Sequence, residues 1–149
     1  MKGVAFTRLR RIPAPGGDVL HAMKDIDPGF AGFGEAYFTT VEAGAVKGWK
    51  RHRRMVMNFV VACGAVRFVV RDDGDVSGES GAQSFDLSPD DPESHARLTV
   101  EPGLWMAFAG LGHGLNLVLN LASIRHDPEE ADNRSLDAFD WAWPRQAQP

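Results

Sequence analysis

Residues 59–70 read FVVACGAVRFVV, and this stretch decides the fold class of the chain. Apolar residues, several of them β-branched or aromatic, flank Gly64 on both sides and favour strands. The connection around Gly64 is too short for a crossover helix, so we expect two buried strands that pair antiparallel through a tight turn. The stretch therefore predicts a core built from β-strands.

Short apolar runs separated by turn residues recur along the rest of the chain. No window before position 115 carries a clean helical period, and 9 prolines and 16 glycines keep the runs short. The expected strands are 3–12, 18–25, 35–44, 45–52, 55–64, 65–73, 83–88, 96–103, 104–111 and 115–123. Roughly nine short strands without helices predict an all-β sandwich or barrel. The tail at 126–144 is expected to hold one short helical turn at most.

Length and composition restrict the class of protein. The 149 residues suffice for a single domain, 1–149, which can bury a core without disulfides or metal. A net charge of −4 and a pI of 5.7 argue against general nucleic-acid binding. The single Cys63 lies in an apolar run, as expected of a buried free thiol in a reducing compartment. Neither a membrane span nor a signal peptide is recognisable, so we expect a cytoplasmic protein.

The stretch KGWKRHRR at 47–54 gathers positive charge around one histidine in an acidic chain. Alternate residues of a strand share a face, so Lys50, His52 and Arg54 should project together into a cavity. Neighbouring positive charge disfavours the imidazolium form and would leave His52 a neutral base. Such a base can remove a proton next to a carbonyl while a cation stabilises the enolate oxygen. The alternative is a solvated strand edge whose charges only keep it soluble.

The spacing of this stretch resembles the first motif of the cupin superfamily, G-x5-H-x-H-x4-E-x6-G. The corresponding positions here are Gly44, Lys50, His52, Met57 and Gly64. His52 alone remains of the metal-binding side chains in that motif, and the histidine of the second motif would fall at Met106. A divalent ion usually needs three or four protein ligands. The resemblance therefore implies a cupin-type jelly-roll β-barrel or sandwich without metal or cofactor.

Within that superfamily the chain resembles the dTDP-4-dehydrorhamnose 3,5-epimerases and related nucleotide-sugar isomerases over most of its length. The likeness is carried by IPAPGGDVLHAMKD (12–25), FGEAYFTTVEAGAVKGWKRH (33–52), VVACGAVRFVVRDD (60–73), LTVEPGLWMAF (98–108) and HDPEEADNRSLDAFDW (126–141). Three catalytic positions of the epimerases differ: Lys50 replaces the base, Met57 a lysine and Asn120 a tyrosine. The sugar 3,4-ketoisomerase pattern H-x-H-K is a closer parallel, and His52 retains its second histidine.

The resemblance implies roles for individual residues, with His52 as the general base. Lys50 would stabilise the enolate, and Lys47 with Arg54 would bind the diphosphate of the substrate. Tyr37 is the only tyrosine and hence the one phenol available as general acid. Further expected contacts to the substrate are Glu35, Asn58, Trp105, Asn120 and Asp132, and either Asp132 or Asn133 would orient His52 from the tail. A surface position is the alternative for Glu35, and core packing is the alternative for Tyr37 and Trp105.

Three functions remain open at this point. The first is an isomerase or epimerase for a nucleotide-diphosphate sugar of the 4-keto-6-deoxy type, which serves polysaccharide or deoxysugar biosynthesis. The family implies a homodimer, and neither nucleic acid nor membrane is an expected partner. The second is a non-catalytic cupin that binds a sugar nucleotide or a protein partner, and the third is a structural barrel. His21, His95, His113 and His126 lack spaced partners and are expected on the surface or in loops.

Overall fold

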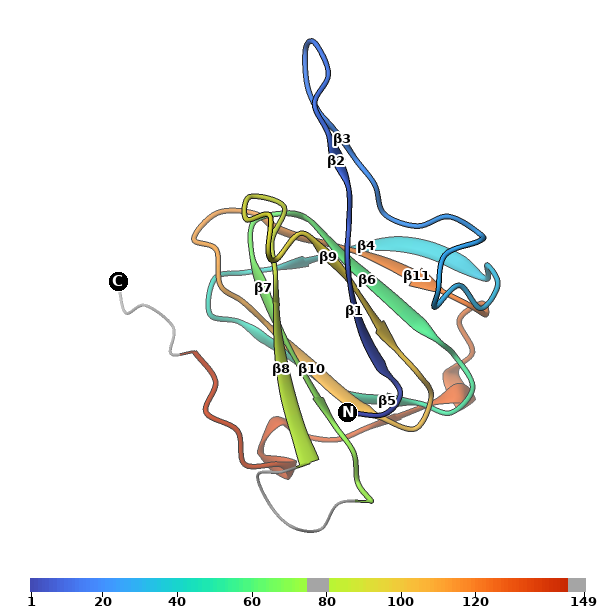
Figure 1. Cartoon of the computed structure of the whole chain (residues 1–149). Coiled ribbons are helices and arrows are strands. Elements are labelled where there is room, and N and C mark those ends of the chain that lie inside the picture. Colours follow the sequence, from blue (N-terminus) through green and yellow to red (C-terminus); the bar gives the residue numbers. More distant parts are fainter. Residues whose placement is uncertain (75–80, 145–149) are drawn as a thin grey trace.

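The computed structural model describes residues 1–74 and 81–144, and its regular structure is almost entirely β-strand (Figure 1). One sheet is built from β1 (Val4–Arg8), β4 (Glu35–Val41), β6 (Met57–Cys63), β9 (Ala96–Val100) and β11 (Asn116–Ala122). The other is built from β5 (Val46–His52), β7 (Val66–Arg71), β8 (Ala82–Leu87), β10 (Trp105–Gly110) and β12 (Ala131–Asn133). Their strand orders are β1-β9-β6-β11-β4 and β12-β5-β10-β7-β8.

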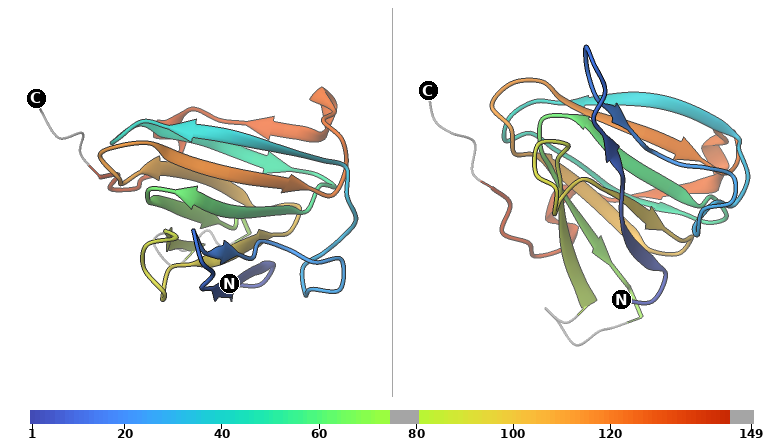
Figure 2. Two further views of the ribbon diagram at one scale, coloured as in Figure 1. Left: turned by 90° about the horizontal axis from the view of Figure 1, so that it is seen from above. Right: turned by 45° about the horizontal axis from the view of Figure 1, so that its top comes forward.

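The two sheets pack on each other through their apolar faces, and the expected all-β cupin jelly roll is confirmed (Figure 2). Phe68 of β7 is fully buried between them. Its ring centroid lies 5.1 Å from that of Phe59 in the opposite sheet and 5.2 Å from that of Phe108 in β10. Because alternate strand residues face the same way, each sheet supplies one apolar layer to this core.

The strands on either side of Gly64 do not pair with each other, so the antiparallel hairpin expected there is wrong. β6 pairs with β9 and β11, whereas β7 pairs with β8 and β10. The chain therefore turns at Gly64 from one sheet into the other. Both strands are apolar and mostly buried, and a local pattern of that kind fits a corner between two sheets as well as a hairpin within one.

One expectation about a single residue is also wrong. Cys63 is exposed, because the last two residues of β6 extend beyond the part of the strand that the other sheet covers. His95 lies in a loop, one of its two expected positions, but it is only 3% exposed, since the loop before β9 folds against the end of β1. There the backbone N–H of Leu9 donates to the His95 carbonyl at 2.9 Å.

The N-terminal part makes a small hairpin and then a long loop. β2 (Arg11–Ile12) and β3 (Val19–Leu20) pair in a hairpin that projects beyond the two sheets (Figure 1, Figure 2). The following loop is held against the first sheet by Arg97, whose guanidinium is fully buried. Arg97 donates to the carbonyls of Ala22 and Pro28 and to the Asp27 carboxylate.

The tail contains two short 3₁₀ turns, Pro128–Glu130 and Leu136–Ala138, with β12 between them. β12 pairs with β5, and the sequence did not predict it because three residues are too few to show alternation. In the part of the chain that the structure describes, no helix is long and apolar enough to cross a membrane.

Candidate functional site

An open cavity of about 340 Å³ lies between the two sheets. The first sheet contributes side chains of β4, β6 and β11, and the second contributes side chains of β5, β10 and the start of the tail. The residues that line it are Tyr37, Thr39, Lys47, Gly48, Trp49, Lys50, His52, Met57, Phe59, Met106, Phe108, Asn120, Asn133 and Arg134. Polar groups therefore meet an apolar wall of methionine and phenylalanine side chains, an arrangement typical of ligand pockets.

His52 lies in this cavity at the end of β5 and is bonded to a buried carboxylate. Its Nδ1 lies 2.7 Å from Oε2 of Glu130, a residue that is 2% exposed. The other carboxylate oxygen, Oε1, accepts the backbone N–H groups of Arg54 and Met55, each at 2.7 Å. When the neutral imidazole donates its Nδ1 proton to Glu130, Nε2 is the nitrogen left to accept a proton.

The ionised form of Glu130 is favoured by these contacts. Burial alone would raise its pKa, but the Arg54 N–H, the His52 ring and the Met55 N–H outweigh burial and hold the pKa below its ordinary value. A carboxylate fixed in this way holds the imidazole in one orientation and stabilises the imidazolium that forms when Nε2 takes up a proton.

β5 contains a bulge next to the cavity. In its pairing with β10, Lys50 lies opposite Met106 and Gly48 opposite Ala107, so Trp49 has no partner in the ladder. The extra residue resets the alternation of side chains, and Lys47 lines the cavity together with Lys50. In a regular strand Lys47 would have faced the opposite side.

The two lysines bring positive charge to the cavity. Within residues 1–74 and 81–144, neither the Lys47 nor the Lys50 side chain makes a hydrogen bond or an ion pair, so no carboxylate of the described residues neutralises them. Lys50 is half-buried, whereas Lys47 lies at the exposed end of the cavity. An ammonium group at a cavity gains from an anionic ligand, and Lys50 gains more because it is partly desolvated, so this arrangement suits a negatively charged substrate.

Tyr37 and Asn120 lie opposite each other on β4 and β11 and both line the cavity. Burial and, to a smaller degree, the charge of Glu35 raise the pKa of the Tyr37 phenol, which therefore keeps its proton. The Asn120 amide nitrogen donates to Thr39 Oγ1 and to the carbonyls of Tyr37 and Val118. Its Oδ1 accepts no hydrogen bond from the described residues and is free to accept one from a ligand.

Asn58 and Trp105 were expected at the cavity, and their placement there is wrong. On β6 the residues that face inward are Met57 and Phe59, so Asn58 faces the opposite side. There it donates to the Gly29 carbonyl at 3.0 Å and accepts from Thr99 Oγ1 at 2.6 Å. Trp105 is 1% exposed and packs on the outer face of its sheet.

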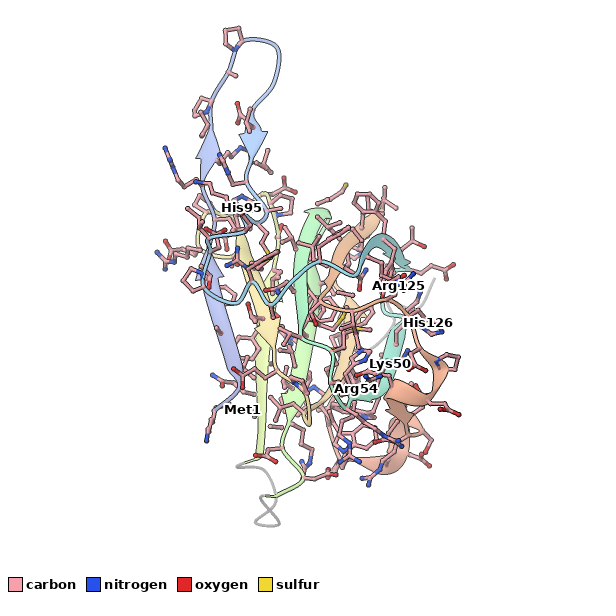
Figure 3. All side chains as sticks on the ribbon, turned by 90° about the vertical axis from the view of Figure 1, so that its right-hand side faces the viewer. Met1, Lys50, Arg54, His95, Arg125 and His126 are labelled. Atoms are coloured by element: carbon pink, nitrogen blue, oxygen red, sulfur yellow. The ribbon has the colours of Figure 1, made fainter. Side chains whose placement is uncertain are left out.

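Arg54 and Glu35 do not line the cavity either. β5 ends at His52, so its alternation does not extend to Arg54, whose exposed guanidinium donates to Asp127 at 3.1 Å. Arg54 lies instead in a shallow groove with Arg125 and His126, on the same side of the molecule as Lys50 (Figure 3). Glu35 begins β4 on the same face as Tyr37 but outside the lined region.

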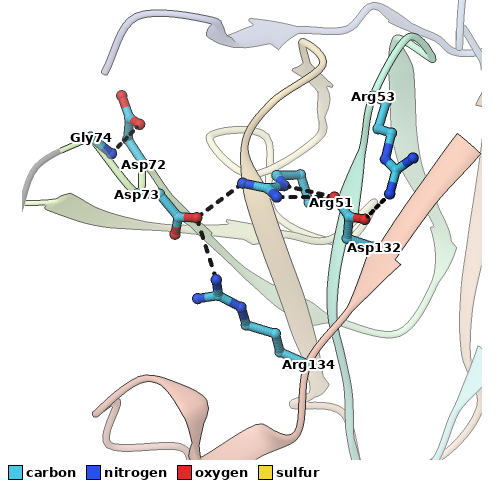
Figure 4. A network of polar contacts seen from close by, with 7 residues as sticks. All are labelled: Arg51, Arg53, Asp72, Asp73, Gly74, Asp132 and Arg134. Atoms are coloured by element: carbon cyan, nitrogen blue, oxygen red, sulfur yellow. Dashed lines mark hydrogen bonds and ion pairs between the residues drawn. The ribbon is translucent and has the colours of Figure 1, made fainter.

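Asp132 does not orient His52, contrary to the expectation from the tail. Its carboxylate accepts from Arg51 and from Arg53, at 3.0 Å and 2.5 Å, on the side of β5 away from the cavity (Figure 4). The residue that bonds His52 is Glu130, two positions earlier, and Asn133 lines the cavity without a hydrogen bond to the ring. The antiparallel pairing of Ala131 with His52 explains this placement, because it aligns the preceding turn with the imidazole.

Sequence reasoning therefore missed Glu130 and Arg134, whereas Asn133, named as a partner for His52, does line the cavity. The acidic run PEEAD offered a signal, but three of its residues are carboxylic acids and their register against β5 decides which one reaches His52. Among the residues that the structure describes, no group of three or more His, Cys, Asp or Glu is arranged to hold a metal ion.

No family model matches the chain, and no curated protein sequence matches it. Solved structures do. A dTDP sugar isomerase from Desulfovibrio desulfuricans G20 is 34% identical, with a TM-score of 0.84 over 95% of this chain and 91% of that one. A sugar 3,4-ketoisomerase from Thermoanaerobacterium thermosaccharolyticum, solved with TDP, is 20% identical, with a TM-score of 0.73 over 92% of this chain and 91% of that one.

A third similar structure is a dTDP-4-dehydrorhamnose 3,5-epimerase from Sulfolobus tokodaii. It is 18% identical, with a TM-score of 0.76 over 95% of this chain and 82% of that chain. The second and third likenesses support the fold, and the first is close enough to identify a family.

Proposed function

Because this chain belongs to the family of cupin-fold dTDP-sugar isomerases and epimerases, we propose that it isomerises a nucleotide-linked 4-keto-6-deoxy sugar. The observation that carries the proposal is the His52–Glu130 pair in a cavity that also holds two lysines. Neither lysine pairs with a carboxylate of the residues that the structure describes. A base beside uncompensated cations is what proton removal next to a ketone requires.

In the proposed reaction, His52 Nε2 removes a proton from the carbon next to the ketone. The electron pair of that C–H bond forms a carbon–carbon double bond, and the carbonyl electrons move to oxygen as an enolate. Lys50 stabilises this oxygen, since an ammonium group within a partly enclosed cavity interacts strongly with developing negative charge. Return of a proton to the same carbon gives an epimer and re-forms the ketone. Return of a proton to the former carbonyl carbon, with transfer of the hydroxyl proton of the deprotonated carbon to the enolate oxygen, gives a shifted ketone; neither route involves a net redox change.

The remaining residues have proposed roles in binding and proton return. Lys47, at the exposed end of the cavity, binds the diphosphate, and Arg54 on the neighbouring rim supports it. Tyr37 is the proposed general acid, because it lines the cavity and keeps its proton. Asn120 Oδ1 is the proposed acceptor for a sugar hydroxyl. We place the protein in the cytoplasm, where sugar nucleotides for polysaccharide or deoxysugar synthesis would reach it.

Exchange of substrate hydrogen with solvent tests the proposal. In D₂O, the wild-type protein should exchange the hydrogen next to the ketone of dTDP-4-keto-6-deoxyglucose, observed by NMR. His52→Asn should slow this exchange by about 10²–10⁴-fold, the usual contribution of a general base. The matched control is His113→Asn, which makes the same change at an exposed residue outside the cavity. Wild-type exchange in His52→Asn would remove this residue from the mechanism.

A second function, binding without catalysis, is favoured by the identity of two cavity residues. Met57 and Asn120 line the cavity at positions where the epimerases, by resemblance, carry a lysine and a tyrosine. A pure binder would gain thermal stability from dTDP, because a ligand of the folded state shifts unfolding by mass action. It would leave the substrate hydrogens unexchanged, so the same NMR experiment separates the two functions.

We also propose that the protein acts as a homodimer. Phe38 on the outer side of β4 is 62% exposed, and Phe33 in the preceding loop is 70% exposed. Large exposed aromatic side chains are favourable anchors for a protein–protein interface. Sedimentation should show twice the 16.3 kDa chain mass, and Phe38→Glu should shift the protein toward monomer. A wild-type protein that sediments as a monomer at micromolar concentration would contradict this proposal.

A further inference from the structure

The outer face of the sheet that carries β5 is covered by an aromatic cluster. Trp49 and Trp105 are each 1% exposed there, together with Val69 and Ala107. Residues 135–143, called here the C-terminal strap, run across this face and bring Phe139, Trp141 and Trp143 against the cluster. The proposed reaction uses none of these rings, although together they include all four tryptophans of the chain.

Trp49 connects this cluster to the cavity on the other side of the sheet. It is the bulge residue of β5, and its neighbours Gly48 and Lys50 both line the cavity. Its own main chain borders the cavity while its indole packs in the outer cluster. The position of Trp49 therefore decides whether the strand stays bulged, and the bulge decides whether Lys47 faces the cavity.

The strap and the residue before it hold Trp49 by several contacts. Its backbone exchanges two hydrogen bonds with Arg134, at 3.2 Å and 3.0 Å, and its indole Nε1 donates to the Leu136 carbonyl at 3.3 Å. The Phe139 ring meets the indole edge-on at a centroid distance of 5.2 Å, and the Trp143 ring lies at 5.7 Å. These contacts fix the indole on the side of β5 that faces away from the cavity.

Cationic side chains tie the start of the strap to the same face. The Arg134 guanidinium lies 4.6 Å from the Trp105 ring centroid and 5.2 Å from that of Phe139. It also pairs with Asp73, which accepts a hydrogen bond from Arg51 of β5 (Figure 4). The strap is thus joined to β5 through rings, backbone and a shared carboxylate.

We propose that the C-terminal strap is a positioning element of the site: Phe139 and Trp143 hold Trp49 in the bulge, and the bulge keeps Lys47 directed into the cavity beside Lys50. The inference rests on the proposed function, in which these lysines meet the anionic parts of a sugar nucleotide. Without the strap, β5 is free to return to regular alternation, which turns Lys47 to the outer face.

The test is a double variant, Phe139→Ala with Trp143→Ala, compared with Val69→Ala. Val69 belongs to the same cluster and is fully buried, but it lies on β7, which contributes no residue to the cavity. We expect the strap variant to bind dTDP at least tenfold more weakly in calorimetry, with a smaller dependence of affinity on salt, because cationic contacts are lost. The affinity of Val69→Ala for dTDP should stay within twofold of wild type, even if its melting temperature falls as far as that of the strap variant.

A double-mutant cycle separates positioning from general loosening. Lys47→Ala alone should weaken dTDP binding, but it should add little in the strap variant, where Lys47 no longer faces the cavity. In the Val69→Ala background it should have its full effect. The proposal would be overturned if Lys47→Ala weakened dTDP binding by the same factor in the strap variant as in Val69→Ala. It would also be overturned if the strap variant and Val69→Ala by themselves lost equal affinity.

Amide hydrogen exchange gives a readout that needs no ligand. The Trp49 N–H, which donates to the Arg134 carbonyl, should exchange at least tenfold faster in the strap variant and at the wild-type rate in Val69→Ala. If wild-type protein neither binds dTDP nor exchanges substrate hydrogen, the proposed function fails, and this measurement still decides whether the strap holds the bulge. Should the double variant not fold, Phe139→Leu and Trp143→Phe carry the same comparison, and unchanged Trp49 exchange in both would overturn the proposal.

Discussion

Replacing Glu130 by glutamine exchanges one oxygen of the buried carboxylate that bonds His52 for an NH₂ group. In the native protein the backbone N–H groups of Arg54 and Met55 donate to Oε1 of the carboxylate, and the glutamine carbonyl can still accept both. Its NH₂ group then faces His52 Nδ1, where the native carboxylate oxygen lies at 2.7 Å. Two donors cannot share that contact, so the imidazole must move its proton to Nε2, and the nitrogen that faces the cavity is no longer a base.

The expected magnitudes follow from these contacts. Loss of a correctly oriented general base should slow hydrogen exchange into the substrate by about 10²–10⁴-fold. Binding of dTDP should be nearly unchanged, because Lys47 and Lys50 do not contact Glu130. Three hydrogen bonds lose their charge assistance, and at about 1 kcal/mol each the free energy of unfolding should fall by roughly 3 kcal/mol.

The assay is the NMR exchange experiment in D₂O, combined with urea unfolding and dTDP calorimetry. Glu129→Gln is the matched control, since Glu129 is the exposed neighbour of Glu130 in the same 3₁₀ turn. It should leave both exchange and stability near the wild-type values. An exchange rate in Glu130→Gln within threefold of wild type would refute the assignment of Glu130 as the residue that orients His52.

The same variant makes a prediction about pH. Because the pKa of Glu130 is lowered in the folded protein, its ionised form stabilises the fold fully above the unfolded-state pKa. This contribution is lost as the pH falls through the lower, folded-state pKa. The stability gap between wild type and Glu130→Gln should therefore narrow on acidification, and a gap that widens at low pH would contradict the argument.

Three further predictions concern the fold and the surroundings of the site. Asp132→Asn should leave hydrogen exchange into the substrate within threefold of wild type, because the carboxylate pairs with arginines outside the cavity. A large loss of exchange would instead support Asp132 as the residue that orients His52. Gly48→Ala, at φ +126° and with its Cβ 2.6 Å from Ala107 Cα, should destabilise the protein by more than Gly103→Ala, which meets no atom within 4 Å and should cost about 1–2 kcal/mol in urea unfolding. Equal losses of unfolding free energy in the two variants would argue against the close approach of Gly48 to Ala107 at the bulge. Phe68→Ala, which removes the ring between the two sheets, should lower the free energy of unfolding by about 3–5 kcal/mol, measured in the same way.

The strand positions followed from local chemistry, because apolar runs and turn residues act within a few positions of each other. Every one of the expected runs after residue 30 overlaps a strand of the structure. Local chemistry did not determine which strands pair with each other. The hairpin expected around Gly64 is instead a corner between sheets, since the burial of β6 and β7 is the same in either arrangement.

At the site, the direction of a side chain was easier to predict for residues of one uninterrupted strand. It was harder to predict where it depends on how another segment packs against that strand. Lys50 and His52 reach the cavity because they are two positions apart on β5. Asn58 was misplaced, because Met57 and Phe59 are the residues of β6 that face the cavity and Asn58 lies between them on the opposite side. The place of Trp105 depends on which face of β10 the tail covers, and no local pattern carries that information.

By itself the sequence determined that this protein is built of strands and that one histidine among cations ends a strand, because both depend on residues close together in the chain. Only the tertiary structure decided that Lys47 also faces the cavity, through the bulge opposite β10. It also decided that Glu130, 78 positions from His52, is the carboxylate that bonds the ring. Such choices are made by the register between segments far apart in the chain, where a shift of one residue exchanges the two faces of a strand.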